Sequence, residues 1–205
     1  MKIIAGAVLL LILVTACASA NWKNRTTANP RTAQSQEEQR VFDNIDDEYL
    51  MAKIFFSNEE RKAYKSLQVD GEKRLFLDNF WRRNDPNPVT ADNEFVNLLK
   101  KRIDYCNTYF THFRAGWSTD RGRIYLKHGE PYEIVKGRTD ILAKHGQKDY
   151  QIWKYRVNSN MTFIFIDLQT HGDYRLIFSD NDELESSYPD WLEYMGEDFD
   201  PAQLY

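Results

Sequence analysis

The sequence is poor in cysteine and has no excess of positive charge. Its 205 residues include two cysteines, Cys17 and Cys106, and the net charge is −4 at pH 7. Cys17 closes an apolar N-terminal run and is expected to carry lipid, which leaves Cys106 without a cysteine partner, so no intramolecular disulfide is expected. Since the chain lacks a basic excess, nucleic acid is not an expected partner.

The N-terminal apolar run is too short to cross a bilayer. It extends over twelve residues, Ile3–Val14, and with Lys2 before it the run is typical of a secretory signal peptide. The segment "VTAC" (14–17) resembles the lipobox of bacterial lipoproteins, in which cleavage precedes an acylated cysteine. We therefore expect residues 1–16 to be removed and Cys17 to attach the protein to a membrane. The alternative is cleavage after "ASA" (18–20), which would release a soluble protein.

Familiar catalytic and metal-binding patterns are missing from the sequence. The four histidines stand singly, without the spacing of a zinc site. Ser118 lies outside the Gly-x-Ser-x-Gly pattern of a nucleophile elbow, and no glycine-rich phosphate loop occurs. The segment "SDNDELE" (179–185) lacks the glycine and distal glutamate of a calcium loop, so we interpret it as a solvated turn. We expect neither a metal nor another cofactor.

Composition divides the mature chain into a tether, one domain and a tail. Residues 17–36 are polar after the cysteine and predict a flexible tether, and residues 37–180 predict a single domain. Residues 180–205 hold nine acids and no lysine or arginine. An acidic tail such as 181–205 is usually solvated and loosely docked, although it could instead cover a basic face of its own domain. Because the tether has no acidic cluster, we expect the domain to face the periplasm of a bacterial envelope.

The first half of the domain has the apolar period of helices. We predict helices over 37–56, over 58–67, over 70–83 and over 91–113. Ser57 and Glu60 form the capping-box pattern at the start of the second, and the prolines of "NDPNP" (84–88) end the third. The apolar stripe of the fourth predicts a buried Cys106, and Gly116 is expected to end this helix as a left-handed cap.

After Gly116 the apolar period changes from about 3.6 to 2. We predict strands at 123–128, 150–157, 161–168 and 174–178, with hairpin turns at 158–160 and 170–173. The last three strands should form an antiparallel meander with 161–168 at its centre. Helices followed by a small, mainly antiparallel sheet predict the α+β class.

Four separated motifs carry a family resemblance. "FWRRNDPNPVTADNEF" (80–95), "GWSTDRGRIYLKHGEP" (116–131), "YQIWKY" (150–155) and "GDYRLIFS" (172–179) resemble, in order and spacing, the bacterial GWxTD domain family. The motif residues we single out are Trp81, Asp85, Pro86, Asn93, Glu94, Gly116, Trp117, Thr119, Asp120, Arg121, Gly122, Gly129 and Pro131. Asn84 departs from the pattern, since the family more usually has arginine there. If that arginine pairs with an acid in other members, the pair is either missing here or made by Arg83. The resemblance covers about residues 50–180 and implies a fold but no activity.

The "GWSTD" segment allows two interpretations. In the structural one, Trp117 folds back on the preceding helix, Thr119 and Asp120 accept backbone N–H groups, and Gly122 lets the chain enter a strand that Gly129 and Pro131 end. In the functional one, Asp120 is a general base or a cation ligand, with Glu130, Glu133 and His128 nearby. We favour the structural interpretation because no nucleophile or metal set accompanies these residues.

These observations favour a non-enzymatic, lipid-anchored periplasmic protein. It would bind another envelope protein through the motif-rich corner. The alternative is a hydrolase of an envelope polymer that uses Asp120 and Glu130. An enzyme requires a concave pocket with converging acids, whereas an interaction protein requires an apolar patch.

Overall fold

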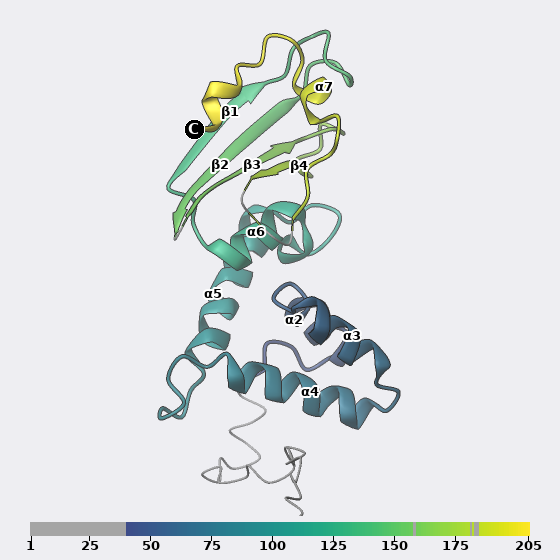
Figure 1. The fold of residues 1–205 in the computed structure, drawn as a ribbon, viewed down its shortest axis with the longest axis vertical. Helices are drawn as coiled ribbons and strands as arrows, with labels where there is room; N and C mark the ends of the chain where they lie inside the picture. Colours follow the sequence, from purple (N-terminus) through teal and green to yellow (C-terminus); the bar gives the residue numbers. More distant parts are fainter. Residues whose placement is uncertain (1–39, 158, 181, 183–184) are drawn as a thin grey trace, which may run out of the picture.

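The computed structural model describes residues 40–157, 159–180, 182 and 185–205. The expected signal peptide, Cys17 and the tether lie outside these ranges. Within them, no helix has both the length and the apolar character that a membrane span requires. Figure 1 shows an elongated molecule with a sheet at one end, helices α2–α4 at the other, and α5 and α6 between them.

The N-terminal helices form a small aromatic lobe. They are α2 (Ile45–Ala52), α3 (Asn58–Ser66) and α4 (Asp70–Arg83). The predicted capping box is confirmed, since the Glu60 N–H donates to Ser57 Oγ and the Ser57 N–H to the Glu60 carboxylate. The rings of Phe56 and Phe80 pack edge to face, with centroids 4.8 Å apart. Such contacts, rather than helix length, hold these short helices together.

Helix α5 (Glu94–Tyr109) is shorter than predicted and does not end at Gly116. Its last backbone bond runs from the Phe110 N–H to the Cys106 carbonyl. Gly116 instead opens a 3-10 turn, η2 (Gly116–Ser118), and is not among the glycines with positive φ. The left-handed cap was therefore wrong, although the predicted burial of Cys106 on this helix is confirmed.

The predicted strand at 123–128 was also wrong, because these residues belong to helix α6 (Asp120–His128). Thr119 caps its start and Gly129, at φ 78°, ends it. Ile124 and Leu126, two residues apart, are both buried. Over only six positions this spacing fits the two-residue period of a strand as well as that of a helix. Glu130 and His128 consequently lie at the end of a helix rather than of a strand.

The sheet is a four-stranded antiparallel meander in the order β1-β2-β3-β4. Its strands are β1 (Glu133–Arg138), β2 (Asp149–Val157), β3 (Ser159–Ile166) and β4 (Arg175–Asp180). The meander of the last three strands and the α+β class are confirmed, and β3 lies inside the sheet. The edge strand β1 was missed.

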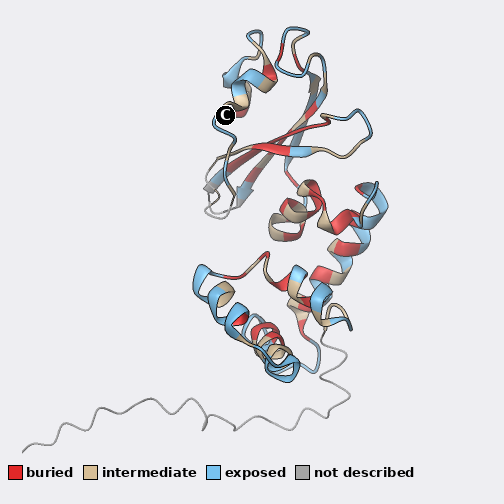
Figure 2. Ribbon diagram, turned by 90° about the vertical axis from the view of Figure 1, so that its right-hand side faces the viewer, coloured by how far each residue is buried: buried red, intermediate tan, exposed pale blue. Residues whose placement is uncertain are grey.

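Both faces of the sheet are covered. Trp153, Phe163 and Phe165 pack with the helices in the larger core, whereas Ile152 and Ile164 face the C-terminal segment in a second core. That segment contains α7 (Trp191–Met195) and the 3-10 turn η3 (Pro201–Leu204). Figure 2 shows buried residues along the strands and at the helices that meet them. Burial on both faces explains why β3 is apolar throughout.

Candidate functional site at the GWSTD corner

The corner is built on close backbone contact between α5, η2 and α6. A Cβ atom on Gly116 would lie 1.9 Å from the Cys106 carbonyl oxygen, and one on Gly122 would lie 2.0 Å from the Gly116 carbonyl oxygen. Neither space admits a side chain. The two glycines therefore let the turn fit between the helices, and neither has the backbone role that the sequence suggested.

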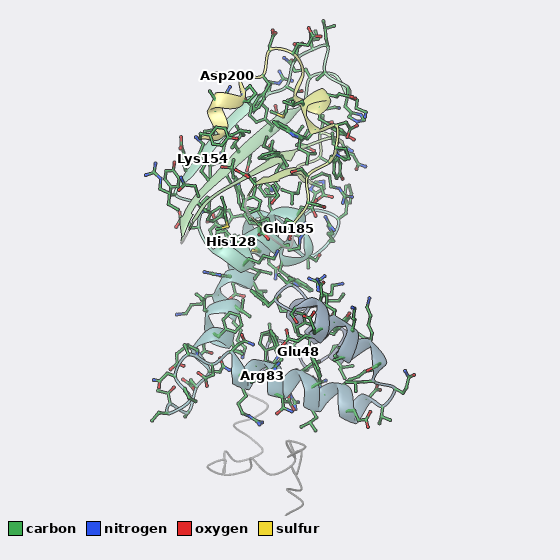
Figure 3. All side chains as sticks on the ribbon, in the orientation of Figure 1. Glu48, Arg83, His128, Lys154, Glu185 and Asp200 are labelled. Carbon is green, nitrogen blue, oxygen red and sulfur yellow. The ribbon has the colours of Figure 1, made fainter. Side chains whose placement is uncertain are left out.

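Trp117 connects the corner to the beginning of the described chain. Its backbone N–H donates to Asn107 Oδ1 on α5 at 3.4 Å, and its ring centroid lies 5.3 Å from that of Phe42. The N–H groups of Val41 and Phe42 donate to the carboxylate of Glu48, which is fully buried on α2 and labelled in Figure 3. Burial raises the pKa of Glu48. The segment that leads in from the expected tether is thus held against both the helical lobe and the signature tryptophan.

Thr119 closes the turn and begins α6. Its Oγ1 accepts the Gly122 N–H at 3.0 Å and donates to the Gly116 carbonyl at 2.7 Å. The neighbouring Ser118 hydroxyl donates to the Ala115 carbonyl at 2.8 Å. A threonine at the N-cap supplies an acceptor for a helix N–H that otherwise has no partner.

Asp120 links α6 to the sheet. Its Oδ2 accepts the backbone N–H of Leu176 on β4 at 3.0 Å, and its Oδ1 accepts from Arg123 Nη1 at 2.8 Å. Both carboxylate oxygens are therefore engaged inside the protein. The first-turn position also favours a negative charge, because the N-terminal end of a helix is electropositive.

Arg121 is a buried cation held between aromatic rings. Its guanidinium carbon lies 4.2 Å from the Tyr174 ring centroid and 4.8 Å from that of Phe110, and Nη2 donates to the Gly172 carbonyl at 2.8 Å. Burial lowers the pKa of Arg121. The side chain joins the end of α5, α6 and the β3–β4 loop, and the ring faces stabilise the buried charge.

A cluster of charges fastens α6 to the segment after β4. Arg123 and Lys127 contact the Glu185 carboxylate at 3.0 and 2.6 Å, and His128 Nε2 lies 2.9 Å from Asp182 Oδ2. Figure 3 shows His128 and Glu185 beside α6. The side chains of Asp182 and Glu185 are only 6% and 9% exposed. A solvated turn was therefore the wrong interpretation for these two acids, which cover a basic face of α6.

The two acids of the alternative enzyme do not lie together. Asp120 is the first residue of α6, whereas Glu130 is exposed and follows the end of that helix. Eight residue steps separate Asp120 from His128, which places the helix ends about 12 Å apart. Gly129 and Pro131 form the bend here, and Tyr155 donates its hydroxyl to the Gly129 carbonyl at 3.0 Å.

The "NDPNPVTADNEF" motif lies at the other end of α5. Asn93 caps that helix by accepting the Val96 N–H at 3.1 Å and donates to the Trp81 carbonyl at 2.8 Å. Asp85 accepts the Asn87 N–H around Pro86, and Glu94 accepts the Thr90 hydroxyl. Fifteen residue steps along α5 separate this motif from Tyr109, or about 22 Å, so the two motifs do not form one site.

Arg83 and Asn84 have separate roles where the sequence departs from the family pattern. Arg83 Nη2 lies 2.8 Å from Glu60 Oε1, an ion pair between α4 and α3. Asn84 Nδ2 donates to the Phe80 carbonyl at 2.9 Å. Arg83 therefore pairs with an acid of α3.

Exposed aromatic side chains beside the corner were not expected from the sequence. Tyr105, Tyr109 and Phe113 are 38%, 63% and 77% exposed. Tyr105 stacks on Tyr125 of α6 with centroids 4.4 Å apart and contacts Tyr109 at 4.5 Å. Phe113 was expected at the end of the predicted helix over 91–113, but α5 ends at Tyr109. The sequence did contain a signal for an exposed aromatic pair: Tyr105 and Tyr109 are four residues apart on the helix and lie outside its buried apolar stripe.

No metal centre is found at the corner. Across the described ranges, no group of three or more histidine, cysteine, aspartate or glutamate side chains is arranged to hold an ion. His112 and His171 approach each other, with ring centroids 6.1 Å apart. Two imidazoles are fewer ligands than a structural or catalytic zinc site uses.

A comparison with protein families extends the resemblance seen in the motifs. A family model described as GWxTD domain matches residues 23–188. The matched range contains the corner, the α4–α5 motif and all four strands. No curated protein and no solved structure matches the chain.

Proposed function

The chain belongs to the GWxTD domain family, and we propose that it is a non-enzymatic, lipid-anchored protein of the bacterial envelope. In this proposal it faces the periplasm and binds another envelope protein through the exposed aromatic side chains at the corner, which we call the aromatic surface. They are Tyr105 and Tyr109, which contact each other on α5, and Phe113, which follows the helix and contacts the rings of His112 and His171. The signature motif holds that surface in place.

The internal bonding of the motif supports a binding role over catalysis. Thr119 is fully used as a cap, both oxygens of Asp120 accept hydrogen bonds, and Arg121 lies between two rings. A general base needs a free acceptor within hydrogen-bond reach of its substrate. Asp120 instead has the environment of a structural carboxylate.

The observation that carries the proposal is the aromatic surface itself. Tyrosine and phenylalanine are enriched in protein interfaces, where a rigid ring buries a large area at low cost in conformational entropy. Tyr105 is already ordered by its stack on Tyr125. The two tyrosines of this surface are therefore preorganised for binding, and they lie on α5, which the motif contacts through the bond from the Trp117 N–H to Asn107.

Photo-crosslinking in cells tests this surface. A photoreactive amino acid replacing Tyr109 or Phe113 should give a discrete crosslinked product, and the matched position Leu75, 53% exposed on α4, should not. Tyr109→Ala with Phe113→Ala should reduce both the product and any growth phenotype of the protein while leaving its melting temperature within about 2 °C of wild type, as surface substitutions usually do. Equal crosslinking at Leu75, or unchanged function in the double variant, would exclude the surface.

The lipid anchor is tested separately. A fatty-acid analogue should label the wild-type protein and not Cys17→Ser, and residues 1–16 should be missing from the mature chain. Equal labelling of both proteins, or an N-terminus at Asn21, would favour the soluble alternative.

The hydrolase alternative makes a different prediction at Asp120 and Glu130. If these acids catalysed a reaction, Asp120→Asn and Glu130→Gln would each abolish function in a protein that melts like wild type. The binding proposal expects Glu130→Gln to keep the crosslink at Tyr109, because Glu130 is exposed and contributes no aromatic ring to the surface.

A further inference from the structure

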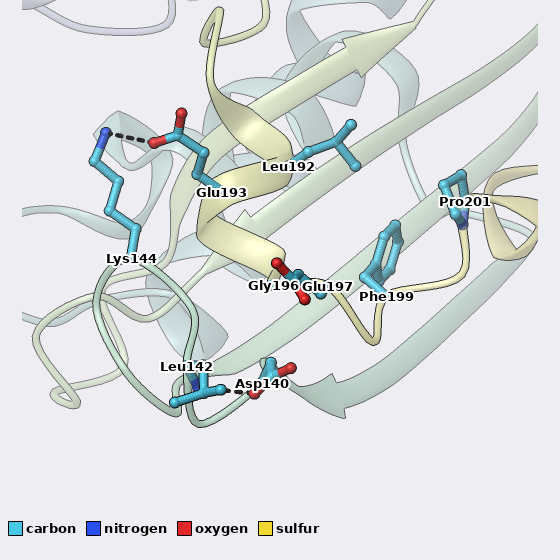
Figure 4. A pocket seen from close by; sticks show the side chains of 9 residues that line it. All are labelled: Asp140, Leu142, Lys144, Leu192, Glu193, Gly196, Glu197, Phe199 and Pro201. Atoms are coloured by element: carbon cyan, nitrogen blue, oxygen red, sulfur yellow. Dashed lines mark hydrogen bonds and ion pairs between the residues drawn. The ribbon is translucent and has the colours of Figure 1, made fainter.

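A second exposed surface lies at the sheet end of the molecule, away from the corner (Figure 1). The β1–β2 loop and the C-terminal segment enclose a hollow of about 690 Å³ that Leu142, Leu192, Phe199 and Pro201 line with apolar atoms. Figure 4 shows these side chains around the hollow, with α7 on one side and the loop on the other. Its volume is within the range of ligand sites.

The loop is ordered by hydrogen bonds. Thr139 Oγ1 donates to the Gly146 carbonyl at 3.0 Å and accepts the Lys148 N–H at 2.8 Å. The Asp140 and Lys144 N–H groups donate to the Met195 and Glu193 carbonyls of α7 at 3.1 and 2.8 Å. The shape of the hollow is therefore fixed before any partner binds.

This ordered loop exposes two aliphatic side chains. Ile141 is 74% exposed and Leu142 87% exposed, and Leu192 across the hollow is 48% exposed. Scattered apolar residues are common on surfaces, but Leu142 and Leu192, which both line a preformed hollow, form a patch of the kind that marks an interaction site. Transfer of these groups out of water would drive binding.

The net charge of the residues around the patch indicates the charge of the partner. Among the described lining residues, three carboxylates, Asp140, Glu193 and Glu197, stand against one ammonium, Lys144, a net charge of −2. Lys144 is already paired with Asp190 and with Glu193. An anionic membrane surface would be repelled, whereas a cationic segment would be attracted.

We propose that this hollow binds a short cationic, amphipathic peptide segment of a partner protein. A bulky apolar side chain of the segment enters between Leu142, Leu192 and Phe199, and flanking lysines or arginines face Asp140, Glu193 and Glu197. This surface is separate from the aromatic surface at the corner, and either can exist without the other. A protein with both would bind two partners at once.

Fluorescence anisotropy on the purified full-length chain tests the hollow. The probe is a labelled synthetic peptide with a leucine–tryptophan pair flanked by lysines, and the control probe has glutamates in place of the lysines. The lysine peptide should bind and the glutamate peptide should not, and the affinity should fall as salt is raised because the charges are exposed.

Matched variants locate the binding. Leu142→Ser should weaken it roughly tenfold, which corresponds to the loss of one buried aliphatic side chain. Glu197→Gln should weaken it roughly threefold, as for an exposed ion pair. Leu98→Ser on α5 and Glu59→Gln on α3, both exposed and far along the chain from the hollow, should change nothing.

Three results would overturn the proposal. The first is no binding of the lysine peptide, or equal binding by wild type and Leu142→Ser. The second is binding of anionic lipid vesicles that Leu142→Ser abolishes, which would assign the hollow to a membrane. The third is tighter binding of a peptide of the chain's own residues 18–36, which carry three cations and no acid. Crosslinking at Tyr109 is an independent readout, so failure here leaves the proposed function standing.

Discussion

Cys106 is a thiol enclosed between α5 and α6. Its side chain is fully buried, and Sγ lies 3.8 Å from the Gly122 carbonyl oxygen. Burial raises the pKa of Cys106 from an ordinary 9.0 to about 12. A thiol reagent should therefore react with the native protein only after denaturant is added. Rapid labelling of the native protein would contradict this placement.

The same burial predicts a pH dependence. Between pH 9 and 12 the unfolded thiol loses its proton while the folded thiol keeps it, so ionisation favours the unfolded state. The stability of wild type relative to Cys106→Ala should fall as the pH rises above about 9, by at most about 1.4 kcal/mol per pH unit. Urea unfolding of both proteins at pH 8 and 10 measures this difference. A constant difference would show that the thiol ionises equally well in the folded state.

Asp120 separates the structural from the catalytic interpretation of the motif. Asp120→Ala leaves the Leu176 N–H and the Arg123 guanidinium without their acceptor, which should cost about 1–3 kcal/mol. Asp120→Asn keeps one acceptor oxygen and should cost less. Thermal melts of both variants, with exposed Asp198→Asn as a neutral control, give the order. Loss of function in an Asp120→Asn protein that melts like wild type would favour the enzyme.

At the scale of the element, the local patterns predicted the helices better than the first strand. Ser57 with Glu60 predicted the start of α3, and the prolines after Arg83 predicted the end of α4. Residues 123–128 were ambiguous because six positions fit either period. Thr119 before them and Gly129 after them are helix signals that would have decided the assignment. Strand β1 was missed because most of its residues are exposed, which leaves only a weak apolar pattern in the sequence. Its place in the sheet comes from its pairing with β2.

Replacement of two helical glycines by alanine should change stability in opposite directions, because only Gly122 lies against the backbone of η2. Gly122→Ala forces a Cβ to within 2.0 Å of a carbonyl oxygen and should cost about 1–3 kcal/mol or more. Gly71→Ala on α4 meets no atom within 4 Å and should stabilise the protein by up to about 1 kcal/mol. Chemical denaturation of the two variants provides the comparison. Equal effects would mean that α6 does not pack as closely as described.

At the scale of the whole molecule, the sequence predicted the α+β class but not how the tail is placed. An acidic composition is compatible with both a solvated tail and a tail that covers a basic face. The structure has Asp182 and Glu185 on the basic face of α6, and it has Met195 and Leu204 buried against the outer face of the sheet. The signal in the sequence was weak, because isolated apolar residues in an acidic segment have no regular period. The hollow depends on contacts between residues 140–144 and 192–201, which a local pattern does not contain.

The covered outer face of the sheet predicts that the tail is part of the folded core. Leu204 is 4% exposed, and its carbonyl accepts the Thr162 hydroxyl at 2.9 Å. Leu204→Ala should therefore destabilise the protein by about 2–5 kcal/mol, the usual cost of truncating a buried leucine. Leu192→Ala, on the same segment but 48% exposed, should cost much less. Urea unfolding measures both variants. If Leu204→Ala unfolded at the same urea concentration as wild type, the tail would be only loosely docked, and the C-terminal segment that lines the proposed hollow would not be fixed in solution.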